Sequence, residues 1–308
     1  MRTGTSAMLY EAVEGWGTLP EGINFGYTHG IVVDGNDNIY VLHSLQPNVV
    51  VFDRDGKYLS SWKLEGIIGT GAHAFYLHRE ADAEYVYLSD SNNGNVVKTT
   101  LQGEVVLRLT RPDLPDVYGE GKPYKPTDVA VAPNGDIYVA DGYGQHWVHR
   151  YSAEGQWLSS FGGTGSEPGK LNSPHGISVK TSGAEPELYV ADRGNYRIQV
   201  FTLDGTHKRF VDHDMDRPCS FYFHEDKMYF PDLNSRVTIF DEHDRLLAHL
   251  GEDQQAYKQK GWPNLPKEYY RPGKLSSPHG VCVDSQGSVY VAEWISDGRL
   301  TKLRRVQA

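Results

Sequence analysis

The strongest constraint on the fold of this 308-residue chain is an internal repeat. Its clearest copy begins with Ser173-Pro-His-Gly-Ile-Ser-Val179 and continues with Glu187-Leu-Tyr-Val-Ala-Asp-Arg193, and the pattern returns at Ser277-Pro-His-Gly-Val-Cys-Val283. Within a copy, short β-branched and aromatic runs alternate with Gly, Asp and Asn turns, which is typical of β-strands. The spacing of about 50 residues indicates one strand-rich unit repeated along the chain.

Six copies are recognisable, and all of them alternate apolar and polar residues at period two rather than at a helical period. They begin near residues 28, 72, 126, 173, 219 and 277. Four-stranded units repeated radially form a β-propeller. We therefore predict an all-β, six-bladed β-propeller in which residues 1–308 form a single domain.

The last copy lacks a fourth strand, whereas Met8-Leu-Tyr-Glu-Ala-Val-Glu-Gly-Trp16 resembles an isolated one. We expect this N-terminal strand to complete the last blade and close the ring, because the pairing would remove two exposed sheet edges.

The composition narrows the function classes. A net charge of −10 argues against nucleic acid as a partner, because phosphate binding relies on clustered Lys and Arg. No apolar run approaches the roughly 20 residues of a membrane span. The first residues lack the apolar core of a signal peptide, and there are only two cysteines, Cys219 and Cys282. We expect both cysteines to be buried small residues, and we expect a cytoplasmic protein without a disulfide scaffold.

The first residues of the six innermost strands should face one mouth of the propeller. They are His29, His73, Asp128, His175, Ser220 and His279. Three histidines, at positions 73, 175 and 279, fall on alternate blades, and three histidines with an open fourth position are typical of a catalytic metal. The alternative is that Pro-His-Gly is only a variant of the repeat sequence without a function in metal binding, and that each imidazole is bonded to local backbone. His29 breaks the alternation and is either a fourth ligand or part of the substrate pocket, for which we also name Asp128.

The ends of the second strands should reach the same mouth. There Tyr143 stands in a loop one residue longer than its counterpart and could act as a general base, while Arg193 could bind a carboxylate. The alternatives are a tyrosine packed on its blade and an arginine paired with Asp192. His43, Ser44 and Trp294 occupy equivalent places and are candidate pocket residues. The repeated aspartates at 90, 141, 192 and 232 are interpreted as turn-stabilising residues.

Two connections between copies are unusually long, residues 111–124 and 252–272. Long loops in compact domains are often functional. We expect both to overhang the mouth and to favour a small-molecule substrate with an aromatic or apolar group, although self-packed surface loops are the alternative.

Two resemblances extend this interpretation. Pro174-His-Gly-Ile177, Tyr189-Val-Ala-Asp192 and Asn195-Tyr-Arg-Ile-Gln-Val-Phe201 resemble NHL repeats of β-propellers. Lys125-Pro-Thr-Asp-Val-Ala-Val131, Asp141-Gly-Tyr143, Asp192-Arg193 and the two Ser-Pro-His-Gly segments together resemble the peptidyl-α-hydroxyglycine α-amidating lyases. That family is a six-bladed propeller with an axial zinc on three histidines. The resemblance implies zinc at His73, His175 and His279, Tyr143 as the base and Arg193 as its electrostatic partner.

This chain departs from that family at several positions. His43-Ser44 stands where the family has an arginine, and Ser277 stands where it has methionine. Gly280 replaces an aspartate that helps to hold a structural calcium, which argues against calcium here. We also expect this chain to lack the family's disulfides and secretion signal. We therefore expect a zinc-type lyase, with iron as an alternative metal, that cleaves a C–N bond of a different, small substrate.

Three other readings stay open at this point. They are a hydrolase of a small amide or ester on the same site, a calcium-dependent lactonase-type propeller, and a non-catalytic NHL propeller that binds a protein or ligand. A histidine-rich set of ligands suits zinc or iron better than calcium.

Overall fold

The described residues form six antiparallel sheets, five with four strands and one with five. The computed structural model describes residues 1–81 and 83–306. The sheets belong to two compact units, Met1–Trp62 with Asp214–Ala308, called here the first unit, and Lys63–His213, called the second unit. These sheets are the blades of an all-β, six-bladed β-propeller, as predicted, whereas the single-domain organisation stays a prediction.

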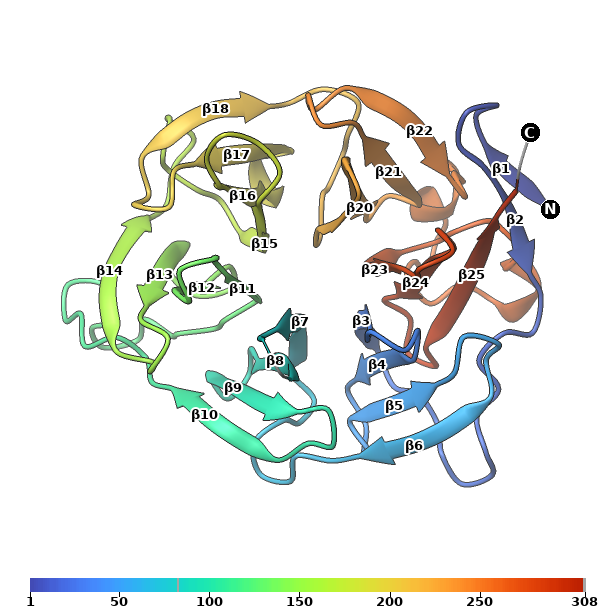
Figure 1. Cartoon of the computed structure of the whole chain (residues 1–308), viewed down its shortest axis with the longest axis horizontal. Helices are drawn as coiled ribbons and strands as arrows, with labels where there is room; N and C mark the ends of the chain where they lie inside the picture. The colour runs from blue at the N-terminus through green and yellow to red at the C-terminus, as the bar shows by residue number, and fades with distance from the viewer. Residues whose placement is uncertain (82, 307–308) are drawn as a thin grey trace. The chain divides into compact units, whose positions relative to one another are not determined.

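The second unit contains blades two, three and four, each a consecutive meander (Figure 1). Their strands are β7 (Ala72–Arg79), β8 (Glu84–Asp90), β9 (Asn95–Thr100) and β10 (Val105–Leu109) in blade two; β11 (Asp128–Val131), β12 (Ile137–Ala140), β13 (Trp147–Tyr151) and β14 (Trp157–Gly162) in blade three; and β15 (Pro174–Lys180), β16 (Glu187–Asp192), β17 (Arg197–Phe201) and β18 (His207–Val211) in blade four.

The first unit contains blades one, five and six. Their strands are β3 (Thr28–Val33), β4 (Ile39–His43), β5 (Val49–Phe52) and β6 (Tyr58–Trp62) in blade one; β19 (Tyr222–His224), β20 (Lys227–Asp232), β21 (Arg236–Phe240) and β22 (Leu246–Leu250) in blade five; and β23 (Pro278–Val283), β24 (Val289–Glu293), β25 (Arg299–Arg305) and β2 (Leu9–Val13) in blade six.

The N-terminal strand completes the last blade, which confirms the prediction. Strand β2 pairs antiparallel with β25, from Tyr10 opposite Arg305 to Val13 opposite Lys302. An additional strand, β1 (Arg2–Gly4), pairs with β2 and makes this blade five-stranded. The repeat did not predict β1, because its three residues have no counterpart in the other copies.

The core lies between the faces of neighbouring blades rather than within one sheet. In the second unit, Tyr138 and Ala140 of blade three cluster with Ile177, Val190 and Phe201 of blade four. The tyrosine of the Tyr-Val-x-Asp pattern is fully buried in several blades, and the hydroxyl of Tyr138 donates a hydrogen bond to the carbonyl of Leu203 at 2.7 Å. A buried tyrosine with a bonded hydroxyl adds apolar area without an unsatisfied donor.

The described residues contain three helices, all single 3-10 turns, at Arg193–Asn195, Ala256–Lys258 and Lys267–Tyr269. No helix in this part of the chain has the length and apolar character needed to cross a membrane. Cys219 and Cys282 are both buried, as expected.

Truncating Tyr10 should destabilise blade six. Tyr10 is fully buried in a cluster with Tyr229, Val289 and Leu303. Removing such a side chain leaves a cavity, so Tyr10→Ala should lower the free energy of unfolding by about 3–5 kcal/mol in urea titrations followed by fluorescence. Val13→Ala is the matched control on the same strand, because Val13 is 36% exposed; we expect its effect to stay within about 0.5 kcal/mol. Equal effects of the two changes would contradict a structural role for β2.

Candidate metal site

Each of the four candidate histidines lies in a β-bulge at the start of an innermost strand. Pairing with the second strand shifts register between Thr28 and Gly30, between Ala72 and Phe75, between Pro174 and Ile177, and between Pro278 and Gly280. The residues inside these shifts include His29, His73, His175 and His279. Blade three has no shift, and Asp128 pairs regularly with Ala140. A bulge re-aims a side chain at the end of a strand, so the bulges direct these imidazoles differently from Asp128.

In the second unit, His73 is held in one tautomer. Its Nδ1 lies 2.7 Å from the backbone carbonyl oxygen of Thr127 in blade three, and a carbonyl can only accept. In the neutral imidazole the ring proton therefore belongs on Nδ1, and Nε2 carries a lone pair. A backbone carbonyl bonded to one ring nitrogen is the usual way in which a metal-binding histidine is oriented.

The phenol oxygen of Tyr143 connects the chemical groups of the second unit. It lies 3.2 Å from Nε2 of His73 and 3.0 Å from Nε2 of His175, and it accepts a hydrogen bond from the Arg193 guanidinium at 3.0 Å. Both histidines are buried, whereas Tyr143 remains 39% exposed. The structure thus brings together four residues that the sequence predicted, with a cation against the tyrosine oxygen.

The loop that carries Tyr143 is fixed by Asp141. One carboxylate oxygen of Asp141 accepts the amide of Lys125 at 2.6 Å, and the other accepts the amide of Gln145 at 2.6 Å. Gly142 allows a close approach, because an added Cβ would lie 2.1 Å from the carbonyl oxygen of Pro174. These contacts agree with the interpretation of the repeated aspartates as turn-stabilising residues.

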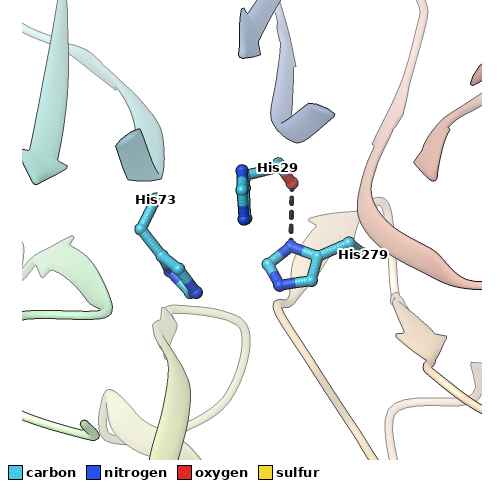
Figure 2. A group of neighbouring side chains, drawn as sticks. All are labelled: His29, His73 and His279. Atoms are coloured by element: carbon cyan, nitrogen blue, oxygen red, sulfur yellow. Dashed lines mark hydrogen bonds between the residues drawn. The ribbon is translucent and has the colours of Figure 1, made fainter. Parts of the chain in front are cut away.

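In the first unit, His279 is oriented in the same way as His73. Its Nδ1 donates to the carbonyl oxygen of His29 at 3.0 Å, so its Nε2 also carries a lone pair. Figure 2 shows this bond between the two histidines, whose ring centroids lie 4.9 Å apart. An added Cβ at Gly280 would lie 2.7 Å from the same carbonyl oxygen. Only glycine therefore fits beside this bond without a shift of the backbone.

Cys219 is a residue of this site that the sequence did not predict. Ligand atoms of Cys219 and His279 lie within 4.8 Å of one another, as do those of His29 and His279. Cys219 is fully buried in blade five, one residue before Ser220, whose hydroxyl donates to the carbonyl of His279 at 3.1 Å. Imidazole nitrogen and thiolate sulfur suit zinc and other transition metals, so this buried His/Cys cluster is consistent with a metal site.

The remaining candidate pocket residues have specific partners. His43 is fully buried, and its Nδ1 accepts the amide of Gly26 at 3.2 Å, while the hydroxyl of Ser44 accepts the amide of Tyr27 at 2.9 Å. Burial lowers the pKa of His43 to about 4. Both side chains therefore fasten the loop that precedes β3.

Asp128 is buried as well. Its two oxygens accept the amides of Val129 and Ile177, at 2.9 and 3.0 Å. Burial raises the pKa of Asp128 to about 7, against the opposing effect of these two amides.

The loop of residues 111–124 is anchored in blade three by its tyrosines. Tyr118 and Tyr124 are buried with Val129 and Tyr151. The hydroxyl of Tyr118 donates to Asp141 at 2.8 Å and lies 2.6 Å from Nε2 of His149, whose Nδ1 lies 2.7 Å from the hydroxyl of Ser160. The loop is thus bonded to the same aspartate that fixes the Tyr143 loop.

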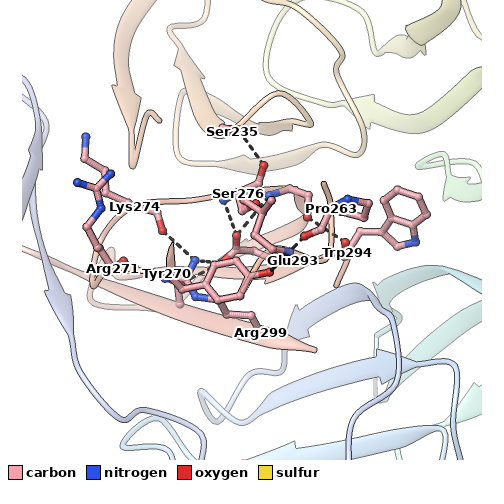
Figure 3. A network of polar contacts seen from close by, with 12 residues as sticks. Ser235, Pro263, Tyr270, Arg271, Lys274, Ser276, Glu293, Trp294 and Arg299 are labelled. Carbon is pink, nitrogen blue, oxygen red and sulfur yellow. Dashed lines mark hydrogen bonds and ion pairs between the residues drawn. The ribbon is translucent and has the colours of Figure 1, made fainter. Parts of the chain in front are cut away.

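The loop of residues 252–272 is tied to blade six by Arg299, which donates to the carbonyl of Arg271 at 2.9 Å and pairs with the buried Glu293 (Figure 3). Glu293 accepts the amide of Ser276 and pairs with Arg299, both at 2.6 Å. Trp262 donates from its indole nitrogen to the carbonyl of Ser276 at 3.0 Å. This places Trp262 beside Trp294.

Three aromatic side chains of the first unit form what we call the aromatic cluster: Tyr27, Trp262 and Trp294. The ring centroids of Trp294 lie 5.5 Å from Tyr27 and 6.3 Å from Trp262. All three are partly exposed. The backbone of Trp294 bonds to Ser277, two residues before His279, since its amide donates to the Ser277 carbonyl at 2.8 Å. The aromatic cluster is therefore anchored to the segment that leads into His279.

Comparison with known proteins identifies NHL repeats in this chain and several similar proteins. The NHL repeat model matches residues 124–151 and 275–298. The chain is 30% identical to human "NHL repeat-containing protein 3" over 210 residues, which is 65% of this chain and 58% of that protein. It is 36% identical to "Peptidyl-alpha-hydroxyglycine alpha-amidating lyase 1" of Drosophila melanogaster over 199 residues, or 57% of this chain and 34% of that protein. The chain thus spans little more than half of the length of the first relative and a third of the second.

Among solved structures, the fold is similar to the one described as "Streptogramin B lyase structure". The TM-score is 0.60 at 11% identity, with 92% of this chain and 95% of that chain covered. At this identity the likeness concerns the fold alone.

The buried His149 should make the protein acid-sensitive. Burial lowers the pKa of His149 from 6.5 to about 3, so between these values the unfolded chain binds a proton that the folded chain does not. The free energy of unfolding should therefore fall by about 1.4 kcal/mol for each pH unit of acidification in this window from His149 alone. His149→Gln should reduce the slope in urea titrations between about pH 6.5 and 5. The exposed His243→Gln is the control; an unchanged slope in the His149 variant would contradict the assignment.

Proposed function

We propose that this NHL-repeat six-bladed β-propeller, whose relatives include amidating lyases, is a metal-dependent lyase that cleaves a C–N bond of a small hydroxylated amide. The observation that carries the proposal is the tautomer of His73 and His279, each of which gives its Nδ1 proton to a backbone carbonyl and keeps Nε2 for a ligand. The similarity to an amidating lyase of Drosophila supports the reaction class.

The proposed ligands are His73, His175 and His279. They occupy the same place in blades two, four and six, inside the bulge of the innermost strand. Three imidazole nitrogens with an open position suit zinc, and iron is the alternative with the same ligands. When bound, the metal would supply a Lewis acid that polarises a substrate oxygen. His29 and Cys219 lie against His279 and would serve as neighbours or additional ligands.

Tyr143 is proposed as the general base and Arg193 as its partner. The guanidinium lies 3.0 Å from the phenol oxygen and would stabilise a phenolate. The phenolate would take the proton of the hydroxyl on the substrate carbon. The oxygen's electron pair would then form a carbonyl, the C–N bond would break toward nitrogen, and the nitrogen would take the proton back from Tyr143. An N-acyl-α-hydroxyglycine would give an amide and glyoxylate, with no water consumed.

The aromatic cluster suggests an aromatic or apolar group on the substrate. Tyr27, Trp262 and Trp294 are partly exposed and held by backbone bonds close to His279. Rigid aromatic side chains contribute large contact area and prefer edge or offset contacts with another ring. A cytoplasmic location and a lack of nucleic-acid or membrane partners stay predictions.

Metal binding gives the first prediction of this proposal. Protein purified without chelators should contain about one zinc or iron per chain by elemental analysis, because three imidazoles bind such ions tightly. His175→Ala should lower Zn²⁺ affinity about 100-fold or more. His78→Ala on β7 is the control, since His78 pairs with Glu80 instead, and it should retain the metal. A chain that binds no metal at micromolar Zn²⁺ would refute the proposed function.

Replacing the base should separate chemistry from metal binding. Tyr143→Phe removes only the phenol oxygen, so metal content and thermal stability should stay unchanged while kcat falls about 100-fold or more. The assay is glyoxylate release from N-benzoyl-α-hydroxyglycine. Hydrolysis of simple esters or amides by the metal-loaded protein without glyoxylate release would favour a hydrolase on the same site, and an unchanged kcat would exclude Tyr143 as the base.

The aromatic cluster can be tested with paired substrates. Trp294→Ala should raise KM about tenfold for N-benzoyl-α-hydroxyglycine and change it little for the N-acetyl compound, because only the former offers a ring. Trp157→Ala, at an exposed position on the outer strand β14, is the control. Equal KM changes for both substrates would mean that the aromatic cluster does not select the acyl group.

A further inference from the structure

We propose that Thr127 and Asp128, in blade three, which supplies no histidine to the proposed site, are positioning residues that orient His73, His175 and the Tyr143 loop. This inference rests on the proposed function for its meaning, although its contacts do not depend on a bound metal. Asp128 is the first residue of the innermost strand β11 and Thr127 directly precedes it; both are buried, Thr127 at 1% and Asp128 at 9% exposure.

Thr127 acts on both sides of its blade. Its carbonyl accepts the Nδ1 proton of His73 from blade two at 2.7 Å. Its hydroxyl lies 2.9 Å from the carbonyl oxygen of Pro174, the residue before His175 in blade four, and 3.1 Å from that of Ala140 in its own blade, so the two acceptors share its one proton. The same hydroxyl accepts the amide of Gly142 at 3.3 Å, next to Tyr143. Thr127 thus bonds to His73 itself and to the residues that directly precede His175 and Tyr143.

Asp128 holds the other side of the His175 bulge. Its Oδ2 accepts the amide of Ile177, two residues after His175, at 3.0 Å, while Oδ1 accepts the amide of Val129. Regular pairing of β15 with β16 is interrupted between Pro174 and Ile177. The bulge is therefore bonded at both ends by the Thr127-Asp128 pair, and His175 lies between these anchors.

A role in the fold alone predicts a different pattern from a role in positioning. Bonds between blades three and four would stabilise the fold wherever they lay, and their loss would lower stability without selecting one histidine. Positioning acts through His175, so its loss should alter zinc binding only while His175 is present. Loss of the groups that orient metal-binding histidines typically lowers metal affinity about 10–100-fold.

The test is a double-mutant cycle on Zn²⁺ affinity, measured by competition with a chromophoric chelator. Asp128→Ala should weaken Zn²⁺ binding about 10–100-fold in the wild-type background. It should have less than about a threefold effect in a His175→Ala background, and its full effect in a His279→Ala background. Equal effects in the His175→Ala and His279→Ala backgrounds would overturn the proposal for Asp128. A loss of thermal stability with unchanged Zn²⁺ affinity would overturn it as well.

A conservative pair tests Thr127 and covers the case in which Asp128→Ala fails to fold. Thr127→Val removes the hydroxyl, whereas Thr127→Ser retains it. We expect the valine variant to lose Zn²⁺ affinity and glyoxylate-forming activity, and the serine variant to stay within about threefold of wild type for both. Indistinguishable valine and serine variants would overturn the role of the hydroxyl.

A readout without metal separates this inference from the proposed function. In metal-free protein with ¹⁵N-labelled histidines, Asp128→Ala or Thr127→Val should shift the ring signals of His175 and leave those of His279 in place. If wild-type protein binds no Zn²⁺, the proposed function fails, but the histidine spectra still show whether Thr127 and Asp128 position His175. Unshifted His175 signals would overturn the positioning itself.

Discussion

The hydrogen bond from histidine Nδ1 to a backbone carbonyl of the next blade is the interaction on which the site depends. It occurs at 2.7 Å between His73 and Thr127 and at 3.0 Å between His279 and His29. Because a carbonyl only accepts, each bond determines the tautomer and leaves Nε2 with its lone pair. The chemistry of these imidazoles therefore follows from how adjacent innermost strands approach each other.

That approach is possible because of small, local departures from regular strands. The β-bulges occur where the histidines lie and are missing in blade three, where the regular start of β11 presents Thr127 and Asp128 to both neighbours. Glycine is required at Gly142 and Gly280, where an added Cβ would lie too close to a backbone carbonyl of the neighbouring blade. Blade three carries no histidine of the site but bonds to both neighbouring blades, which carry His73 and His175. All three blades of the second unit therefore contribute to the arrangement of these residues.

The two long loops differ in how far their aromatic side chains are buried. Residues 111–124 bury Tyr118 and Tyr124 and bond to Asp141, so this loop mainly supports blade three. Residues 252–272 place Trp262 beside Trp294 with a partly exposed surface. Packing therefore favours the self-packed interpretation for the first loop and leaves the second as the source of the proposed substrate contacts.

The sequence by itself determined the six-bladed propeller, the N-terminal strand in the last blade and the candidate residues Tyr143, Arg193 and the histidines. It could do so because period-two alternation is a local pattern that every copy displays, and Ser-Pro-His-Gly is a short motif that two copies share. Only the tertiary structure revealed Cys219 beside His279, the Tyr118–His149 contact and the bonds of Thr127 and Asp128 across the His175 bulge. These contacts join residues of different copies, and their partners are largely backbone amides and carbonyls, which every residue possesses and no side-chain pattern can mark.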